Sequence, residues 1–282
     1  MQTNTINQVL TLDKISKIAP SVFQTSAKDT LSKKYNFIPT VELVKEMERS
    51  GWLPVKAVES KTRIEGKNGY QKHMVRFRNF DENAGGKLEV GDSFIELVLT
   101  NSHDGLSSFI FNLGLFRLAC SNGMVVPEST FGAARIRHNS YDATNVIDIC
   151  AQTIEEAPQI IGNVNEMKAI ELTIPEQEAF ANSAKLLRFD NPEDVSTDSL
   201  LRAKRISDKG DNLWKTFNRV QENMEKGGVM YRNYNKDGQF TGTRHSREVK
   251  SIDGGIKLNQ ALWQLAEEMK RLKTGSIMAT VN

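Results

Sequence analysis

Long apolar runs and cysteines are scarce in this sequence of 282 residues, and each shortage excludes a class of protein. No stretch approaches the roughly 18 consecutive apolar residues of a membrane-spanning helix, so the sequence predicts no membrane contact. The N-terminus has no basic segment followed by an apolar one, which excludes a secretory signal and favours a cytoplasmic protein. The 2 cysteines, Cys120 and Cys150, lack metal-site spacing, and we expect them to be buried, reduced thiols.

Catalytic signatures are missing as well. The sequence has no glycine-rich loop for phosphates, no dinucleotide fingerprint, no GxSxG and no paired-histidine metal motif. It therefore predicts no cofactor and favours a non-enzymatic protein. One alternative stays open, a hydrolase or nuclease that holds a divalent ion with His103, Asp104 and His138, although NSHDG has the composition of a simple turn.

After the N-terminal helices, the spacing of apolar residues is that of strands and then that of helices, and this order predicts an α+β fold. Residues 1–35 are polar and predict an arm with one short helix, and a helix is expected over 40–51, with Thr40 as its N-cap and Gly51 as its stop. The period then becomes that of strands. The expected strands are 53–63, 72–79, 93–101, 109–120 and 133–138. We expect residues 36–140 to form an antiparallel β-meander sheet with a covering helix.

From residue 142 the apolar spacing is that of helices. The expected helices are 142–157, 174–189, 211–228 and 258–273, with Pro158 ending or kinking the first of them. Residues 229–257 are expected to be a loop rich in glycine, asparagine and arginine. We expect residues 141–282 to form a helical half packed on the sheet.

A polar stripe runs along the helix that contains Trp214. It consists of Asn218, Gln221 and Glu222, opposite an apolar stripe. The favoured interpretation is exposed helix surface, and contact with arginines of the sheet is the alternative.

Charge is unevenly distributed, although the net charge is only +2. Six basic residues against one acidic residue give residues 61–80 a charge of +5. Ten acidic and three basic residues give residues 151–200 a charge of −7, and twelve basic and six acidic residues give residues 201–250 a charge of +6. Segregation on this scale indicates a basic face for a polyanion, or solvated faces that partly pair with one another.

The basic residues fall where strands and loops can display them. Alternation along 72–79 places Arg76 and Arg78 on one face of a strand, with Val75 and Phe77 on the other. The residues expected to contact nucleic acid are Arg63, Lys72, Arg76, Arg78, Arg117, Arg135, Arg137, Arg244 and Arg247. Stacking faces for bases are expected from Tyr70, Phe80, Tyr231 and Tyr234, although aromatic residues make up only 7% of the chain.

Arg117 has two interpretations. It lies in GLFRLACSNG, at the far end of an apolar strand, where its side chain can reach solvent at the sheet margin. It is either an edge charge on an ordinary strand or a contact for phosphate or carboxylate, helped by Arg135, Arg137 and His138.

Several blocks of the sequence resemble a known family. The blocks are TNSHDGLSSFIFNLGLFRLACSNGM, IRHNS, LWKTFNRVQENMEKGG and REVKSIDGG followed by LNQALWQLAEEM. They occur in order between about residue 40 and residue 272, and they resemble the phage- and plasmid-borne proteins called domain of unknown function 932. This resemblance implies a mobile genetic element as context and carries no catalytic residues.

A second similarity concerns topology. A helix ending at Gly51-Trp52, a basic β-meander and then helices look like the core of single-strand annealing proteins of the RecT, Redβ and Erf kind. Those proteins bind single-stranded DNA along a basic groove, form rings or filaments and need no nucleotide, which would imply a homo-oligomer here.

The favoured function is therefore a non-enzymatic protein of a mobile element that binds or anneals single-stranded DNA. The alternative is a protein-interaction module that inhibits a host defence factor, with the acidic stretch 151–200 imitating the charge of a nucleic acid.

Overall fold

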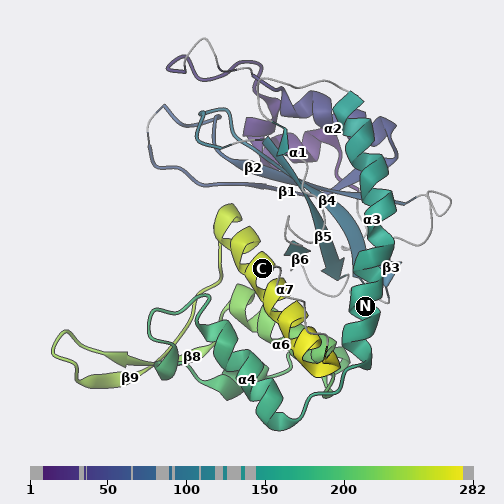
Figure 1. Cartoon of the computed structure of the whole chain (residues 1–282). Helices are drawn as coiled ribbons and strands as arrows, with labels where there is room; N and C mark the ends of the chain where they lie inside the picture. The colour runs from purple at the N-terminus through teal and green to yellow at the C-terminus, as the bar shows by residue number, and fades with distance from the viewer. Residues whose placement is uncertain are drawn as a thin grey trace, which may run out of the picture. The chain divides into compact units, whose positions relative to one another are not determined.

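The structure is a computed structural model, and the chain divides into two compact units, which are described separately (Figure 1). The residues described are 9–31, 35, 37–64, 66–80, 89–90, 93–107, 109–117, 123–125, 135–136 and 144–275. Unit 1 is Met1–Gln159 and unit 2 is Ile160–Asn282, so the division falls inside helix α3 (Thr144–Ala169) rather than at residue 140.

The main feature of unit 1 is an antiparallel sheet, which confirms the α+β class. Its main strands lie in the order β1 (Trp52–Glu59), β2 (His73–Asn79), β4 (Ser93–Asn101) and β5 (Phe109–Arg117), which is a meander. The short strand β3 (Glu89–Val90) pairs with β4, and β6 (Gly123–Val125) and β7 (Arg135–Ile136) pair with β5. The sequence did not predict β3 or β6, each of which has only 2 or 3 residues.

One face of this sheet is apolar. Register pairs Val75 with Leu99 and Phe77 with Leu97, and all four side chains are buried. Since side chains alternate along a strand, His73 and Asn101 share this face at its end.

Helix α2 (Thr40–Arg49) covers the apolar face. Leu43, Val44 and Met47 are buried, and Gly51 follows the helix with a φ of 82°, a conformation that glycine adopts without strain. Thr40 is not the N-cap that the sequence predicts, because Pro39 holds that position and the Thr40 hydroxyl contacts the His73 ring instead. The contacts of Thr40 with His73 and Asn101 place the start of α2 on this face.

The N-terminal arm contains a short helix, as expected, and joins unit 1. Helix α1 (Leu12–Ile18) buries Ile15, and the 3-10 turn η1 (Pro20–Phe23) follows it. The backbone N–H of Leu10 donates to the carbonyl oxygen of Pro54 in β1, which ties the arm to the sheet.

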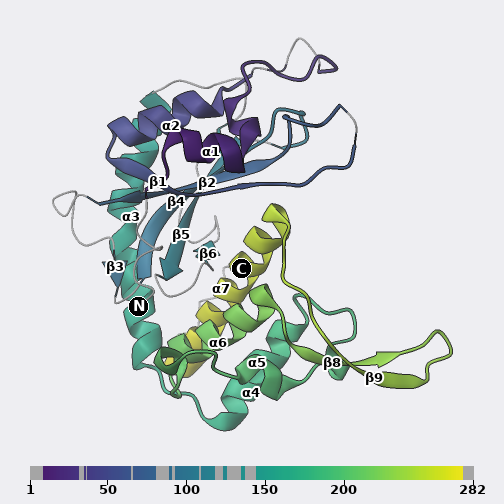
Figure 2. The same ribbon diagram turned by 180° about the vertical axis from the view of Figure 1, so that it is seen from behind.

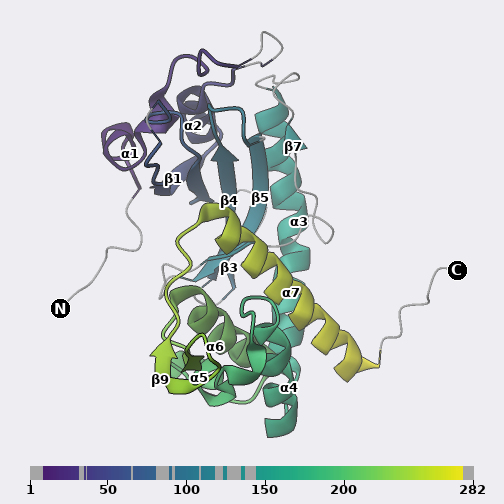
Figure 3. The same ribbon diagram turned by 90° about the vertical axis from the view of Figure 1, so that its left-hand side faces the viewer.

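Unit 2 is mainly helical and begins within α3. Its helices are α4 (Ile174–Lys185), α5 (Thr197–Leu201), α6 (Leu213–Lys226) and α7 (Ile252–Thr274), with 3-10 turns η2 (Pro192–Asp194) and η3 (Ile206–Asp208) between them (Figure 3). Pro158 does not end α3, which continues to Ala169. Trp263 of α7 packs edge-on against Phe217 of α6 at 6.2 Å between ring centroids, which forms part of the core of unit 2.

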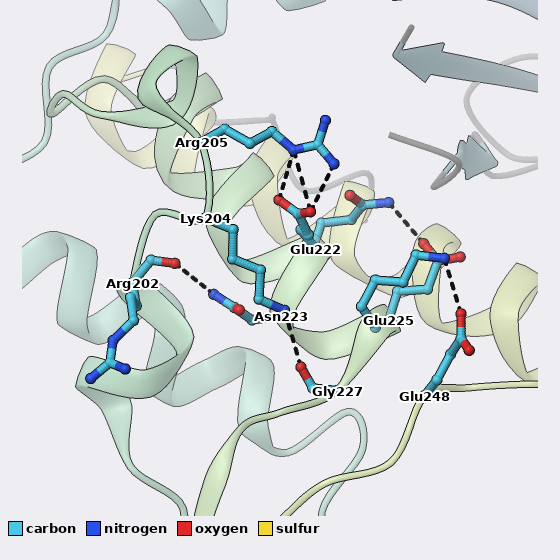
Figure 4. A network of polar contacts seen from close by, with 10 residues as sticks. Arg202, Lys204, Arg205, Glu222, Asn223, Glu225, Gly227 and Glu248 are labelled. Carbon is cyan, nitrogen blue, oxygen red and sulfur yellow. Dashed lines mark hydrogen bonds and ion pairs between the residues drawn. The ribbon is translucent and has the colours of Figure 1, made fainter. Parts of the chain in front are cut away.

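Helix α6 buries the polar side chains that the sequence predicts to be exposed. Asn218, Gln221 and Glu222 are 4%, 5% and 8% exposed. Gln221 donates to Asn259 of α7, and Glu222 accepts a hydrogen bond from Arg205 at 2.9 Å (Figure 4). The prediction of an exposed stripe is therefore wrong, because α6 is central in unit 2 and has polar partners on several sides.

Residues 229–257 are not simply a loop, as the sequence predicted. They contain the hairpin of β8 (Met230–Tyr234) and β9 (Phe240–His245) and the first residues of α7. The hairpin projects away from the helices of unit 2 (Figures 1 and 2). In the part of the chain that the structure describes, no helix is long and apolar enough to cross a membrane.

Candidate nucleic-acid interface

The β8–β9 hairpin displays arginine and aromatic side chains together. Its register pairs Tyr231 with Arg244 and Arg232 with Thr243, so alternate residues project on opposite faces. Met230, Arg232 and Tyr234 are exposed, whereas Tyr231 and Asn233 are half-buried. One face of the hairpin therefore meets solvent, and the other faces its own unit.

The inward face borders an open depression of about 540 Å³, called here the basic depression. Its lining combines three arginines and a histidine with two aromatic rings, and contains no carboxylate. The charged and aromatic lining residues are Arg188, Arg244, His245, Arg247, Phe189 and Tyr231. Arg244 and Arg247 are exposed, and neither has an ion-pair partner among the described residues. This arrangement attracts an anion, because no carboxylate lines the depression beside these cations.

Arg188 connects the segment after α4 to the segment after β9. Its Nη2 donates to the carbonyl oxygen of Arg247. Its guanidinium carbon lies over the ring of Phe189, 5.4 Å from the ring centroid. Its Nη1 is buried and has no hydrogen-bond partner within the described ranges. Burial lowers the pKa of Arg188 below the usual value for arginine, since part of the guanidinium has lost its water.

The outward face of the hairpin presents an aromatic pair. Tyr234 and Phe240 are opposite each other in the register, 42% and 59% exposed, with ring centroids 6.0 Å apart. Exposed rings beside cations supply stacking surfaces for bases next to contacts for phosphates. Arg232 lies on the same face and is also without an ion pair among the described residues.

Arg76 and Arg78 are not displayed to solvent as the strand pattern predicted. They are 6% and 4% exposed, and both bind Glu96 of β4, which is fully buried. The Arg76 Nε to Glu96 Oε2 distance is 2.7 Å. The prediction took account of one strand alone, whereas the adjacent strand carries the carboxylate that both arginines bind. A buried guanidinium that binds a carboxylate is not a surface contact for a polyanion.

The other predicted contact residues are dispersed over the chain, and the side chains of some of them are not described. Arg63 is exposed in the β1–β2 connection, and Lys72 is half-buried beside β2. Arg117 and Arg135 lie on β5 and β7, and only their backbones are described. Arg137 lies outside the described residues. Of the predicted residues whose side chains the structure describes, only Arg244 and Arg247 share one depression.

The histidines of unit 1 form a buried cluster around Thr40. The His73 and His103 ring centroids are 5.1 Å apart, and Thr40 Oγ1 lies 2.9 Å from His73 Nε2 and 3.4 Å from His103 Nε2. His73 Nδ1 lies 2.9 Å from Ser21 Oγ and 3.1 Å from the Gln71 carbonyl oxygen. Burial, and then the neighbouring His103, lower the pKa of His73 to about 3, so this ring is neutral at pH 7.

The structure describes two of the three residues of the metal site considered from the sequence, His103 and Asp104. Asp104 Oδ1 accepts hydrogen bonds from Ser102 Oγ and the Leu106 backbone, as an acid in a turn does. His138 and Cys120 lie outside the described residues, and Cys150 lies on α3 with its side chain undescribed. Among the described residues, no group of three or more His, Cys, Asp or Glu is placed to hold a metal ion.

Part of the acidic stretch 151–200 is paired within unit 2. Glu166 of α3 pairs with Lys270 at 2.7 Å, and Glu176 of α4 pairs with Lys273 at 2.9 Å. Glu176 also completes a capping box with Thr173. Lys270 and Lys273 follow the basic run 201–250, so these contacts engage part of the acidic stretch but do not pair the charge runs with one another.

Sequence reasoning missed the hairpin residues Arg232 and Phe240 and the role of Arg188. A signal for the hairpin was present in the sequence. The segments MYRNY and FTGTRH contain aromatic and β-branched residues typical of strands, and NKDGQ between them has the composition of a turn. No local signal pointed to Arg188, because it lies more than fifty residues from Arg247, whose carbonyl oxygen it contacts.

Comparison with known proteins supports the resemblance seen in the sequence. The family described as "Domain of unknown function (DUF932)" matches residues 28–263. Two proteins of Escherichia coli (strain K12), UPF0380 protein YafZ and UPF0380 protein YfjQ, are each 35% identical over 268 residues, covering 92% of this chain and 91% of each relative. No solved structure matches significantly. The chain therefore belongs to the DUF932 family.

Proposed function

We propose that this protein binds nucleic acid through the β8–β9 hairpin and that it favours single strands. The observation that carries the proposal is the basic depression, where Arg188, Arg244 and Arg247 meet with no carboxylate in the lining. Phosphates attract such cations by release of counterions, and this attraction does not depend on base sequence.

Single strands are favoured because of the aromatic pair beside the cations. Tyr234 and Phe240 have exposed rings, and an unpaired base can stack on them. A base inside a duplex has both of its faces covered by neighbours, so it gains nothing from these rings unless it leaves the helix. The single-stranded preference therefore rests on Tyr234 and Phe240, and the affinity for phosphate on the arginines.

The test is fluorescence anisotropy of a labelled single-stranded oligonucleotide over a salt series, with a duplex of the same sequence alongside. The variant is the double substitution Arg244→Gln and Arg247→Gln. Each lost phosphate contact on a single strand lowers the magnitude of the salt slope by about 0.7, so the double variant should lower it by about 1.4.

The matched control is Arg202→Gln. Arg202 is exposed, has no ion pair among the described residues and does not line the basic depression. Figure 4 shows its side chain on the segment before α6. This control should retain the parent slope. Absence of binding by the parent protein at low salt would overturn the proposal, and so would equal losses in the control and the double variant.

A further inference from the structure

A second depression adjoins the basic one in unit 2. It has a volume of about 490 Å³ and shares Arg188, Phe189 and Tyr231 with the basic depression. It follows the outer edge of β8, where Tyr231 forms an isolated bridge with Val195. We call it the mixed depression, because acids and amides line it along with Arg188 and Arg232.

The acids of the mixed depression distinguish it from a site for phosphates alone. Asp190 and Asp194 line it, a few residues from Arg188 in the sequence. At physiological ionic strength charges act over roughly 8 Å, so carboxylates here weaken the attraction of the neighbouring cations for a polyanion. Carboxylates instead favour a ligand that brings N–H donors next to its phosphate, as a nucleotide does.

The two carboxylates differ in how far they are already engaged. Asp194 Oδ1 accepts the hydroxyl of Tyr234 at 3.1 Å, which holds this ring beside the depression. Asp190 is exposed, and no described residue bonds to its side chain. The lining thus combines rings for stacking with acceptor oxygens that are open to a ligand.

We propose that the mixed depression receives one base of a bound single strand and prefers guanine, while the basic depression holds a neighbouring phosphate; this inference rests on the proposed function. The Watson–Crick edge of guanine carries two adjacent donors, N1–H and N2–H, which match the two oxygens of a carboxylate. Thymine offers one N–H between two carbonyl oxygens, which a carboxylate repels. Phe189, Tyr231 and Tyr234 supply the apolar surface against which the base lies.

The experiment compares two labelled single strands of about 12 nucleotides, a length within the range that one such surface covers. One strand is all thymine, and the other has a single central guanine, which avoids folded guanine tracts. Binding is measured by anisotropy at one fixed salt concentration. The guanine-containing strand should bind about tenfold more tightly, the lower part of the range for a bidentate contact with a base.

The double variant Asp190→Asn and Asp194→Asn should lose this preference while it still binds the all-thymine strand. The matched control is Asp237→Asn, an exposed acid in the turn of the same hairpin that lines neither depression. Equal affinity of the parent protein for both strands would overturn the inference and leave the proposed function standing. A preference that persists in the double variant would also overturn it, whereas absence of binding to either strand would overturn the proposed function itself.

Discussion

Arg76 and Arg78 of β2 and Arg244 of β9 all project from strands, but their surroundings differ. The two arginines of unit 1 are 6% and 4% exposed and share the fully buried Glu96. Arg244 is exposed, pairs across the hairpin with Tyr231 and has no ion pair among the described residues. The difference shows that an arginine within a strand pattern becomes a binding residue or a structural one according to its neighbours.

The size of each sheet accounts for this difference. Strand β2 lies between β1 and β4, so its side chains have neighbours on both sides, and β4 supplies the carboxylate. The hairpin has only two strands, and most of its side chains are exposed. Cations on a two-stranded hairpin therefore remain hydrated and open to an anion.

Removing the shared carboxylate should have the largest effect on stability. Glu96→Gln removes the buried carboxylate that both guanidinium groups bind, and we expect unit 1 to lose about 3 kcal/mol or more of unfolding free energy. Urea unfolding followed by circular dichroism measures the loss. The comparison variant is Glu248→Gln, which removes the more exposed pair with Lys226 and should cost less than about 1 kcal/mol. Equal costs for both variants would contradict the structural role of the buried pair.

Acid should destabilise unit 1 through His73. Its folded pKa of about 3 lies below the 6.5 of a free histidine, so the unfolded chain binds more protons between these values. Stability is therefore fully present above about pH 6.5 and is lost towards pH 3, by at most about 1.4 kcal/mol per pH unit. The measurement is the unfolding free energy against pH for the parent and for His73→Asn. The substitution should reduce the slope in this window, and an unchanged slope would contradict the role of His73.

Removal of one exposed ring should weaken binding without affecting stability. Phe240→Ala removes the more exposed partner of the aromatic pair, and we expect the affinity for a single strand to fall about tenfold. Phe240→Tyr retains the ring and should bind like the parent protein. An unchanged affinity in Phe240→Ala would show that the exposed ring of Phe240 does not stack on a base.

Arginine substitutions in the hairpin should have the smallest effect on stability. Arg244→Gln removes an exposed side chain without an ion pair among the described residues, so the unfolding free energy should change by no more than about 0.5 kcal/mol. Arg76→Gln removes one partner of the buried group and should cost several times as much. Urea midpoints of the two variants, measured under one set of conditions, check this contrast.

The alternation of Val75 and Phe77 with Arg76 and Arg78 was sufficient to predict β2 and its apolar face. It did not show that the opposite face is buried, because that depends on Glu96, twenty residues away along the chain. The same limit applies to α6, whose polar stripe is buried by partners from other segments such as Arg205 and Asn259.

The candidate site was predicted only in part for a related reason. Arg244 and Arg247 were identified from composition, but the hairpin that carries Arg244 was taken for a loop because glycine and asparagine interrupt its strands. The convergence of Arg188 with these residues depends on tertiary contacts that no local pattern contains.

The most direct test compares one exposed arginine of unit 1 with two exposed arginines of unit 2. Single-strand binding is measured over a salt series for the parent protein, for Arg63→Gln in unit 1 and for the double variant Arg244→Gln and Arg247→Gln in unit 2. If the hairpin is the interface, the double variant alone lowers the salt slope, by about 1.4, and Arg63→Gln retains the parent value. A reduced slope in Arg63→Gln with an unchanged double variant would place the interface on unit 1 and contradict the account.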